Sequence, residues 1–179
     1  MSELLDILKL TGICPIIASA EPDSAVPAVQ ALVEGGVPVV EVLMRNEISK
    51  VNLKKIAEGL PDIQVGAGTI LTEDQAKEAL DLGAKFLVLP GFQRKVVELC
   101  VNRNVPVLPG CVTATEIMMA LDYGIQTVKF FPVYQMGGLD TLAQLYGGPF
   151  PNVRYVVTGG LNSVNFLPLM THKSVLAAG

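Results

Sequence analysis

Histidine, charge and long apolar runs are all scarce in this sequence of 179 residues. The single histidine, His172, cannot build a His-rich metal site, and its setting predicts a surface position. The net charge of −4 provides no basic surface for nucleic acid. No apolar run approaches the roughly 18 residues that a membrane span needs, and the acidic, helix-patterned N-terminus is unlike a signal peptide. These features argue against nucleic-acid-binding and membrane-spanning proteins.

Cysteines are few, and their arrangement is uninformative for metal binding. Cys14, Cys100 and Cys111 are an odd number and lack the spacing of a metal site. Each lies beside apolar residues, which predicts buried, reduced thiols and is typical of a cytoplasmic protein. Because 50% of the residues are apolar and only 17% are charged, the chain can bury a large core.

What the sequence does contain is a regular alternation of apolar runs and helical patterns. Eight short apolar runs begin roughly 20 to 27 residues apart, the spacing of one strand, one helix and two short loops. The runs cover residues 13–19, 37–44, 64–70, 86–90, 105–110, 127–132, 153–160 and 174–179. They are almost continuously apolar, as expected of parallel strands covered on both faces. Eight strands and seven intervening helices favour a closed (β/α)8 TIM barrel over a doubly wound open sheet.

Start and stop signals mark three of the intervening helices. The first is predicted to end at the glycine pair Gly35–Gly36. Thr72 is the predicted N-cap of another helix. Thr113 and Glu116 have the spacing of a capping box at the start of a third.

The last apolar run ends the sequence, so no eighth helix follows the eighth predicted strand. Barrels of this class usually have about 250 residues. We therefore expect one TIM-barrel domain over residues 1–179 that is incomplete at its C-terminus. Loss of the eighth helix from the protein itself is the alternative.

Polar side chains interrupt two of the apolar runs. Glu41 and Arg45 share one face of the second predicted strand, and Lys129 lies on one face of the sixth. The apolar residues that alternate with them can cover the helix-facing side. Glu41, Arg45 and Lys129 are therefore predicted to face the barrel axis, toward the carboxyl ends of the strands where barrel active sites lie.

Two further strand ends have a composition suited to binding. The third run contains GAG followed by Thr69, and these small residues leave room in the middle of the barrel. The seventh run ends in TGG, whose glycines let backbone N–H groups approach an anion.

Each of these features also has a purely structural interpretation. Glu41 and Lys129 could form a buried structural ion pair, and Lys129 could extend past a strand edge into water. Arg45 could be an ordinary loop arginine. GAGT and TGG could be tight strand ends. The residue pattern alone leaves these alternatives open.

Seven segments, from about residue 10 to the end, together resemble one enzyme family. They are VVEVLMR, VGAGTILT, LPGF, LPGCVTATE, ALDYGIQTVKFFP, GGPFPNVRYVVTGG and SVLAAG. KFFP and the E-x-x-x-R pattern of the second strand are specific in combination. In this order the segments resemble the 2-keto-3-deoxy-6-phosphogluconate (KDPG) aldolases, a family that includes 4-hydroxy-2-oxoglutarate (KHG) aldolase activity. The resemblance implies a TIM-barrel lyase that is a homotrimer and needs no metal and no organic cofactor.

The resemblance also implies roles for four residues at the reacting centre. Lys129 in VKFFP resembles the Schiff-base lysine, and Glu41 in VEVLMR resembles the general acid and base. Arg45 and Thr69 resemble the groups that hold the pyruvate carboxylate and its carbonyl side. Burial of Lys129 and a nearby cation, for which we expect Arg45, would favour the neutral amine that attacks a ketone.

Five more residues resemble the walls and the anion site of the family. Pro90 in LPG and Phe131 in KFFP resemble pocket walls. Thr158, Gly159 and Gly160 resemble half of a phosphate site. The other half in the family is a Gly-Ser element after strand eight, which would follow the end of this sequence. The first predicted strand lacks the arginine that some members carry.

The implied reaction is the cleavage of a 2-keto-3-deoxy sugar acid. KDPG, giving pyruvate and glyceraldehyde 3-phosphate in the Entner–Doudoroff pathway, is the first expectation. Cleavage of 4-hydroxy-2-oxoglutarate to pyruvate and glyoxylate is the alternative. The expected partner is thus a small-molecule 2-keto acid, with no nucleic acid and no membrane. A metal-dependent pyruvate aldolase, a phosphosugar isomerase and a truncated, non-catalytic barrel module are competing hypotheses.

Overall fold

Strands and helices alternate along the chain in the computed structural model, which describes residues 2–18, 21 and 24–179. The strands are β1 (Ile16–Ile17), β2 (Val39–Leu43), β3 (Gln64–Gly68), β4 (Phe86–Val88), β5 (Val107–Leu108), β6 (Thr127–Phe130), β7 (Arg154–Val157) and β8 (Val175–Ala178). The helices are α1 (Ser2–Thr11), α2 (Ala25–Glu34), α3 (Glu47–Gly59), α4 (Glu73–Asp81), α5 (Arg94–Asn102), α6 (Ala114–Asp122), α7 (Gly138–Gly147) and α8 (Phe166–Met170). Each expected apolar run contains one strand. Ser19, the last residue of the first run, lies outside the described residues.

The strands pair in parallel and in chain order. β1 to β5 form one sheet, and β6 to β8 form a second. Two single bridges join the sheets: Gly110 pairs with Lys129, and Ile13, before β1, pairs with Ala178 of β8. The amide of Cys14 donates to the carbonyl of Ala178 at 2.8 Å across the second junction. The strands therefore form a closed barrel, which confirms the predicted TIM barrel and excludes the open sheet.

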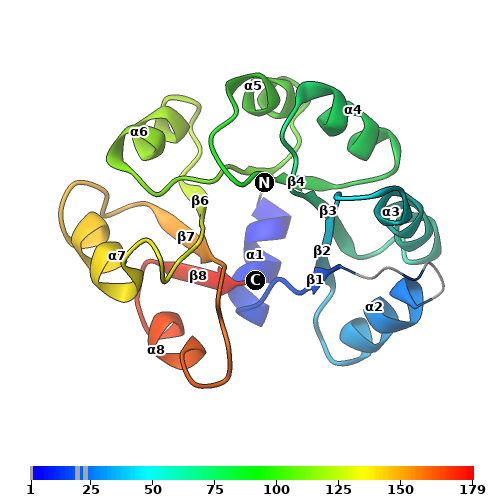
Figure 1. Cartoon of the computed structure of the whole chain (residues 1–179), viewed down its shortest axis with the longest axis horizontal. Helices are drawn as coiled ribbons and strands as arrows, with labels where there is room; N and C mark the ends of the chain where they lie inside the picture. Colours follow the sequence, from blue (N-terminus) through cyan, green and yellow to red (C-terminus); the bar gives the residue numbers. More distant parts are fainter. Residues whose placement is uncertain (1, 19–20, 22–23) are drawn as a thin grey trace.

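The larger hydrophobic core lies between the barrel and its outer helices. Figure 1 shows α2 to α8 arranged around the strands. Val40 and Val42 of β2, and Val128 and Phe130 of β6, pack into this outer core. These are the residues predicted to face the helices, so the predicted alternation is confirmed for both strands.

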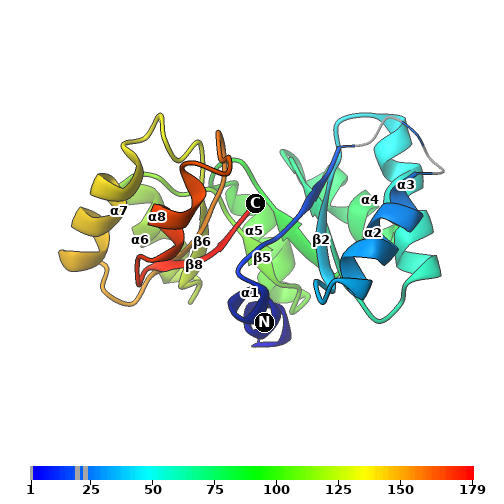
Figure 2. The same ribbon diagram turned by 90° about the horizontal axis from the view of Figure 1, so that it is seen from below.

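A smaller core fills the inside of the barrel at one end. Val39 of β2 and Phe86 of β4 belong to it, together with Leu4 and Leu8 of α1. Figures 1 and 2 show α1 in the middle of the ring of helices and below the strands, so it covers one end of the barrel. Because the first residue of β2 packs in this core, α1 lies at the amino ends of the strands. The opposite end, where the strands finish, is left for a site.

The predicted helix boundaries are confirmed where the sequence carries capping signals. The amide of Gln75 donates to Thr72 Oγ1 at 3.2 Å, and the side chain of Gln75 accepts from the amide of Thr72, which completes a capping box on α4. Thr113 and Glu116 form the same arrangement on α6. α2 ends at Glu34, directly before the glycine pair.

All three cysteines are buried free thiols. Burial raises the pKa of Cys100 and of Cys111 to about 12, so both stay protonated near neutral pH. The prediction of buried, reduced cysteines is confirmed.

His172 is only partly exposed, so the predicted surface position is confirmed in part. The residue is half-buried in the turn before β8. Its Nδ1 atom lies 2.7 Å from Ser174 Oγ, and its ring meets the ring of Tyr146 edge-on at 5.7 Å between centroids. Tyr146 belongs to α7, so the packing of a helix that is distant in sequence covers the histidine.

Candidate active site

Lys129 lies inside the barrel at the seam between the two sheets. Its amide donates to the carbonyl of Pro109 at 2.9 Å, and its carbonyl accepts from the amide of Cys111 at 2.9 Å. These two hydrogen bonds fix the backbone, and the alternation of β6 turns the side chain inward. Only 7% of the residue is exposed, so the alternative in which Lys129 extends past a strand edge into water is wrong.

Glu41 faces Lys129 from β2. The Nζ atom of Lys129 lies 3.6 Å from Glu41 Oε1, and both side chains are almost fully enclosed. This separation makes an ion pair without a close hydrogen bond. Within the part of the chain that the structure describes, Glu41 Oε1 has no hydrogen-bond partner. A purely structural buried ion pair needs its remaining lone pairs satisfied, whereas this one leaves an acceptor free.

Burial raises the pKa of the Glu41 carboxyl above its ordinary value. The positive charges of Lys129 and, to a lesser degree, Arg45 oppose this shift without reversing it. A raised pKa helps a carboxyl group to hold a proton and then give it up, as an alternating base and acid must. The neighbouring Cys14 thiol has its pKa raised, first by burial and then by the charge of Glu41, so it remains protonated.

Arg45 follows β2 and meets the residue that follows β3. Its Nε atom donates to Thr69 Oγ1 at 3.4 Å. Arg45 is exposed at the rim of the barrel, and Thr69 is half-buried. Thr69 has a φ of 62°, in the left-handed region that β-branched residues rarely adopt. Such backbone strain concentrates at functional sites, and here it accompanies the contact between the hydroxyl and the guanidinium group.

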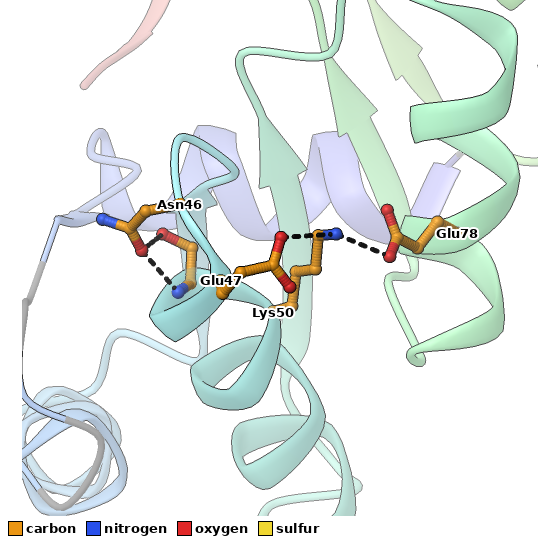
Figure 3. Close-up of polar contacts among 5 residues, drawn as sticks. Asn46, Glu47, Lys50 and Glu78 are labelled. Atoms are coloured by element: carbon orange, nitrogen blue, oxygen red, sulfur yellow. Dashed lines mark hydrogen bonds and ion pairs between the residues drawn. The ribbon is translucent and has the colours of Figure 1, made fainter.

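The turn that carries Arg45 is fixed by polar contacts at the start of α3 (Figure 3). Asn46 caps the helix, since its Oδ1 atom accepts from the amide of Ser49 at 2.9 Å. Lys50 pairs with Glu47 at 2.9 Å and with Glu78 of α4 at 2.8 Å. A cavity of about 180 Å³ adjoins Arg45 and is lined by these charged residues. α3 and α4 are thus tied together beside the guanidinium group.

Phe131 and the glycines after β7 lie on another side of the space around Lys129. The Phe131 ring centroid lies 5.4 Å from Lys129 Nζ. Gly159 and Gly160 have φ values of 98° and 73°, which glycine adopts without strain. A Cβ atom on Gly159 would lie 3.1 Å from Cδ2 of Phe131, so this turn packs closely on the aromatic wall.

Thr158 and Pro90 are the last of the site residues predicted from the sequence. Thr158 is 3% exposed, and its Oγ1 atom has no hydrogen-bond partner among the described residues. Pro90 is half-buried after β4. Its carbonyl oxygen lies only 2.3 Å from where a Cβ atom on Gly110 would be, and Gly110 pairs with Lys129. Pro90 is therefore one strand away from the lysine.

The β6–α7 and β7–α8 loops are joined by a contact that the sequence did not predict. The hydroxyl of Tyr134 donates to the carbonyl of Asn165 at 2.6 Å. The side chain of Asn165 in turn donates to the carbonyl of Gly160 at 2.9 Å. The loop that contains the glycine pair is therefore tied to the loop that follows Lys129 and Phe131. A local sequence pattern cannot predict the contact between Tyr134 and Asn165, because these residues are 31 positions apart.

Two absences apply to the described residues alone. No three His, Cys, Asp or Glu side chains of residues 2–18, 21 and 24–179 are grouped so that they could hold a metal ion. Within the same residues, no helix combines the length and the apolar character that a membrane span requires.

The comparisons with known proteins agree with this geometry. The family model for KDPG and KHG aldolases matches residues 4–179. The chain is 37% identical to the 2-dehydro-3-deoxy-phosphogluconate aldolase of Treponema pallidum (strain Nichols), over 100% of this chain and 85% of that protein. It is 38% identical to the KHG/KDPG aldolase of Escherichia coli (strain K12), over 97% of this chain and 81% of that protein.

A solved structure gives the same result. The KDPG aldolase of Legionella pneumophila, with pyruvate captured as a covalent carbinolamine intermediate, superimposes with a TM-score of 0.93. The identity is 31%, and the match covers 98% of this chain and 84% of that chain. The chain therefore belongs to the KDPG and KHG aldolase family.

Proposed function

We propose that this chain is a class I aldolase that cleaves KDPG to pyruvate and glyceraldehyde 3-phosphate through an imine on Lys129. The observation that carries the proposal is the buried amine of Lys129, 3.6 Å from a carboxylate oxygen that has no other partner in the described part of the chain. A buried lysine beside a titratable carboxyl group is the pair that imine chemistry needs. Membership of the family supports the reaction class.

The first half of the reaction builds an electron sink. Lys129 Nζ, as the neutral amine, attacks C2 of the keto acid, and the carbonyl oxygen takes up a proton to give a carbinolamine. Glu41 supplies the proton that lets water leave, and the protonated imine remains. The name of the Legionella relative, which describes pyruvate as a covalent carbinolamine, supports this first step.

The second half breaks the carbon–carbon bond. Glu41, now a carboxylate, takes the proton of the C4 hydroxyl, directly or through one water. The C4–O bond becomes the carbonyl of the aldehyde, and the electrons of the C3–C4 bond move into the imine to give an enamine. The enamine takes a proton at C3, and water hydrolyses the imine to free pyruvate and Lys129. The raised pKa of Glu41 suits a group that alternates between acid and base.

The remaining site residues bind and orient. We assign the substrate carboxylate to Arg45, whose planar guanidinium group can donate two hydrogen bonds. Thr69, already bonded to Arg45, completes the carboxylate and carbonyl side. Phe131 and Pro90 form the pocket walls and limit water.

We assign the phosphate end of KDPG to Thr158, Gly159 and Gly160. The hydroxyl of Thr158, which has no hydrogen-bond partner among the described residues, and the left-handed glycine turn present donors at the carboxyl end of β7. Cleavage of 4-hydroxy-2-oxoglutarate to pyruvate and glyoxylate is the second candidate function. It is favoured by the double name of the Escherichia coli relative.

We also propose the setting in which the enzyme works. The chain acts as one barrel domain, assembles as a homotrimer and works in the cytoplasm on a small-molecule keto acid. Three free, buried thiols are consistent with a reducing compartment.

A turnover assay tests the proposed function. Pyruvate release is measured with KDPG and with 4-hydroxy-2-oxoglutarate, for the wild type and for Lys129→Met, with and without a metal chelator. We expect chelator-resistant release from KDPG that Lys129→Met abolishes. Release that the chelator stops, or that survives Lys129→Met, would contradict the imine mechanism. Faster release from 4-hydroxy-2-oxoglutarate would reverse the order of the two substrates.

A further inference from the structure

Gly66 and Gly68 of β3 lie on the face of the strand that lines the barrel interior. A side chain at each position would contact a different neighbour. A Cβ atom on Gly68 would lie 1.9 Å from Glu41 Oε1 and 2.6 Å from its Cδ atom. A Cβ atom on Gly66 would lie 2.3 Å from the ring of Phe86. Neither glycine has a left-handed φ, so backbone conformation does not require a glycine at either position. Both positions require a residue without a side chain, because neighbouring side chains already fill the adjacent space.

The space above Gly68 is occupied by the carboxyl end of Glu41. β2 and β3 are adjacent, with Leu43 opposite Gly68 and Glu41 opposite Gly66. The Glu41 side chain therefore leans along the strands and lies against the backbone of Gly68, where it is 2% exposed and reaches Lys129. Any side chain on Gly68 would occupy the same volume as the carboxylate.

We propose that Gly68 is a positioning residue: its missing side chain sets where the Glu41 carboxylate stands relative to Lys129. The proposal rests on the proposed function, because it assigns Gly68 an effect on the proton transfers of that reaction. Gly68 itself touches no reacting atom. It acts through Glu41 alone.

The two glycines respond differently to a methyl group for a physical reason. Glu41 is flexible, and because the inner core fills the amino end of the barrel, we expect a Cβ atom on Gly68 to displace its carboxyl end toward the barrel mouth. Phe86 is a fully buried, rigid ring in the inner core, so a Cβ atom on Gly66 must push the core apart. Gly68→Ala should therefore damage chemistry more than stability, and Gly66→Ala should do the reverse.

Displacement of Glu41 should also change the pH dependence of kcat/KM. Burial is the main cause of its raised pKa. A carboxyl group that moves toward water is less buried, so its pKa falls toward the ordinary value. The acid limb of the kcat/KM profile should then move to lower pH in Gly68→Ala.

The test compares both alanine variants with the wild type in thermal unfolding, kcat, KM and the pH profile with KDPG. For Gly68→Ala we expect kcat to fall about 100-fold, the loss typical of a misplaced acid–base group, with the acid limb at lower pH and Tm nearly unchanged. For Gly66→Ala we expect a Tm lower by several degrees and a kcat within about threefold of wild type. Glu41→Gln tests whether Gly68 acts through Glu41, because glutamine keeps the size of the side chain and cannot exchange the proton. The loss of kcat caused by Gly68→Ala should be smaller in the Glu41→Gln background than in the wild type.

Three results would overturn the proposal. They are a Gly68→Ala enzyme with wild-type kcat and pH profile, a Gly68→Ala chain that fails to fold, and multiplicative losses of kcat in the Glu41→Gln and Gly68→Ala double variant. Failure of the proposed function is a separate outcome, since it would appear as a wild-type enzyme that releases no pyruvate.

Discussion

Lys129 and Glu41 extend from β6 and β2 into the same buried space, with 3.6 Å between Nζ and Oε1. The separation permits electrostatic attraction and leaves an acceptor free for a substrate or a water. Burial raises the pKa of the Glu41 carboxyl, and the charge of Lys129 opposes that shift without reversing it. A carboxyl group in this setting suits alternating proton transfers.

The stability of Lys129→Met should depend on pH through Glu41. The pKa of Glu41 is raised in the folded protein, chiefly by burial, and removal of Lys129 takes away the main opposing charge. A raised pKa contributes stability below the unfolded-state value, and that contribution is lost as pH rises through the folded-state value. Thermal unfolding should therefore show Lys129→Met falling further below the wild type at pH 8 than at pH 5.

The double variant Glu41→Gln with Lys129→Met is the control for that prediction. It has no titrating group at the site, so its Tm difference from the wild type should lack the additional loss at high pH that Lys129→Met shows. Equal pH dependence in the single and double variants would mean that another group is responsible.

Replacement of Glu41 by glutamine should separate catalysis from folding. Glutamine preserves size and cannot exchange the proton, so kcat should fall by about 100-fold or more, while pyruvate affinity changes little. Steady-state kinetics and pyruvate titration measure the two quantities. If Glu41→Gln instead unfolds the protein, Glu41 is a member of a structural ion pair and the catalytic assignment is wrong.

Replacement of Arg45 by alanine should weaken binding of the keto acid. Loss of charge-assisted hydrogen bonds to a carboxylate should raise KM by about 10-fold or more. Arg94→Ala is a matched control, because Arg94 is also exposed and its guanidinium group donates to Tyr123 on the outer helices. An equal effect of both substitutions would indicate a general loss of positive charge.

Replacement of Tyr134 by phenylalanine should affect the phosphorylated substrate selectively. The Tyr134 hydroxyl ties Asn165, and through it the Gly160 carbonyl, to the loop after β6. Loosening this turn should lower kcat/KM for KDPG about fivefold, the value of one hydrogen bond, with little change for 4-hydroxy-2-oxoglutarate. Tyr146→Phe on α7 is the control. Equal losses with both substrates would place Tyr134 outside phosphate recognition.

The barrel and its inward-facing residues were predictable because period-two alternation is local. Glu41 and Lys129 stand out as charged residues in apolar runs, and the apolar residues beside them do face the helices. The capping boxes of α4 and α6 were predictable for the same reason, since each spans one helical turn.

The contacts that could not be predicted depend on the register between distant segments. The packing of Glu41 against Gly68 requires the pairing of β2 with β3, and the covering of His172 requires the placement of α7. Arg45 was expected beside Lys129, and the contact that the structure provides is with Thr69. The left-handed φ of Thr69 has no sequence signal, because threonine rarely adopts it.

The most direct test of the central claim is reductive trapping of the imine. The wild-type chain is incubated with pyruvate and sodium borohydride, its intact mass is measured, and the modified residue is mapped by peptide mass spectrometry. We predict one reduced pyruvate adduct per chain, on Lys129, and none on Lys129→Met. An adduct on another lysine, or a wild-type chain that turns over substrate without any adduct, would contradict the account.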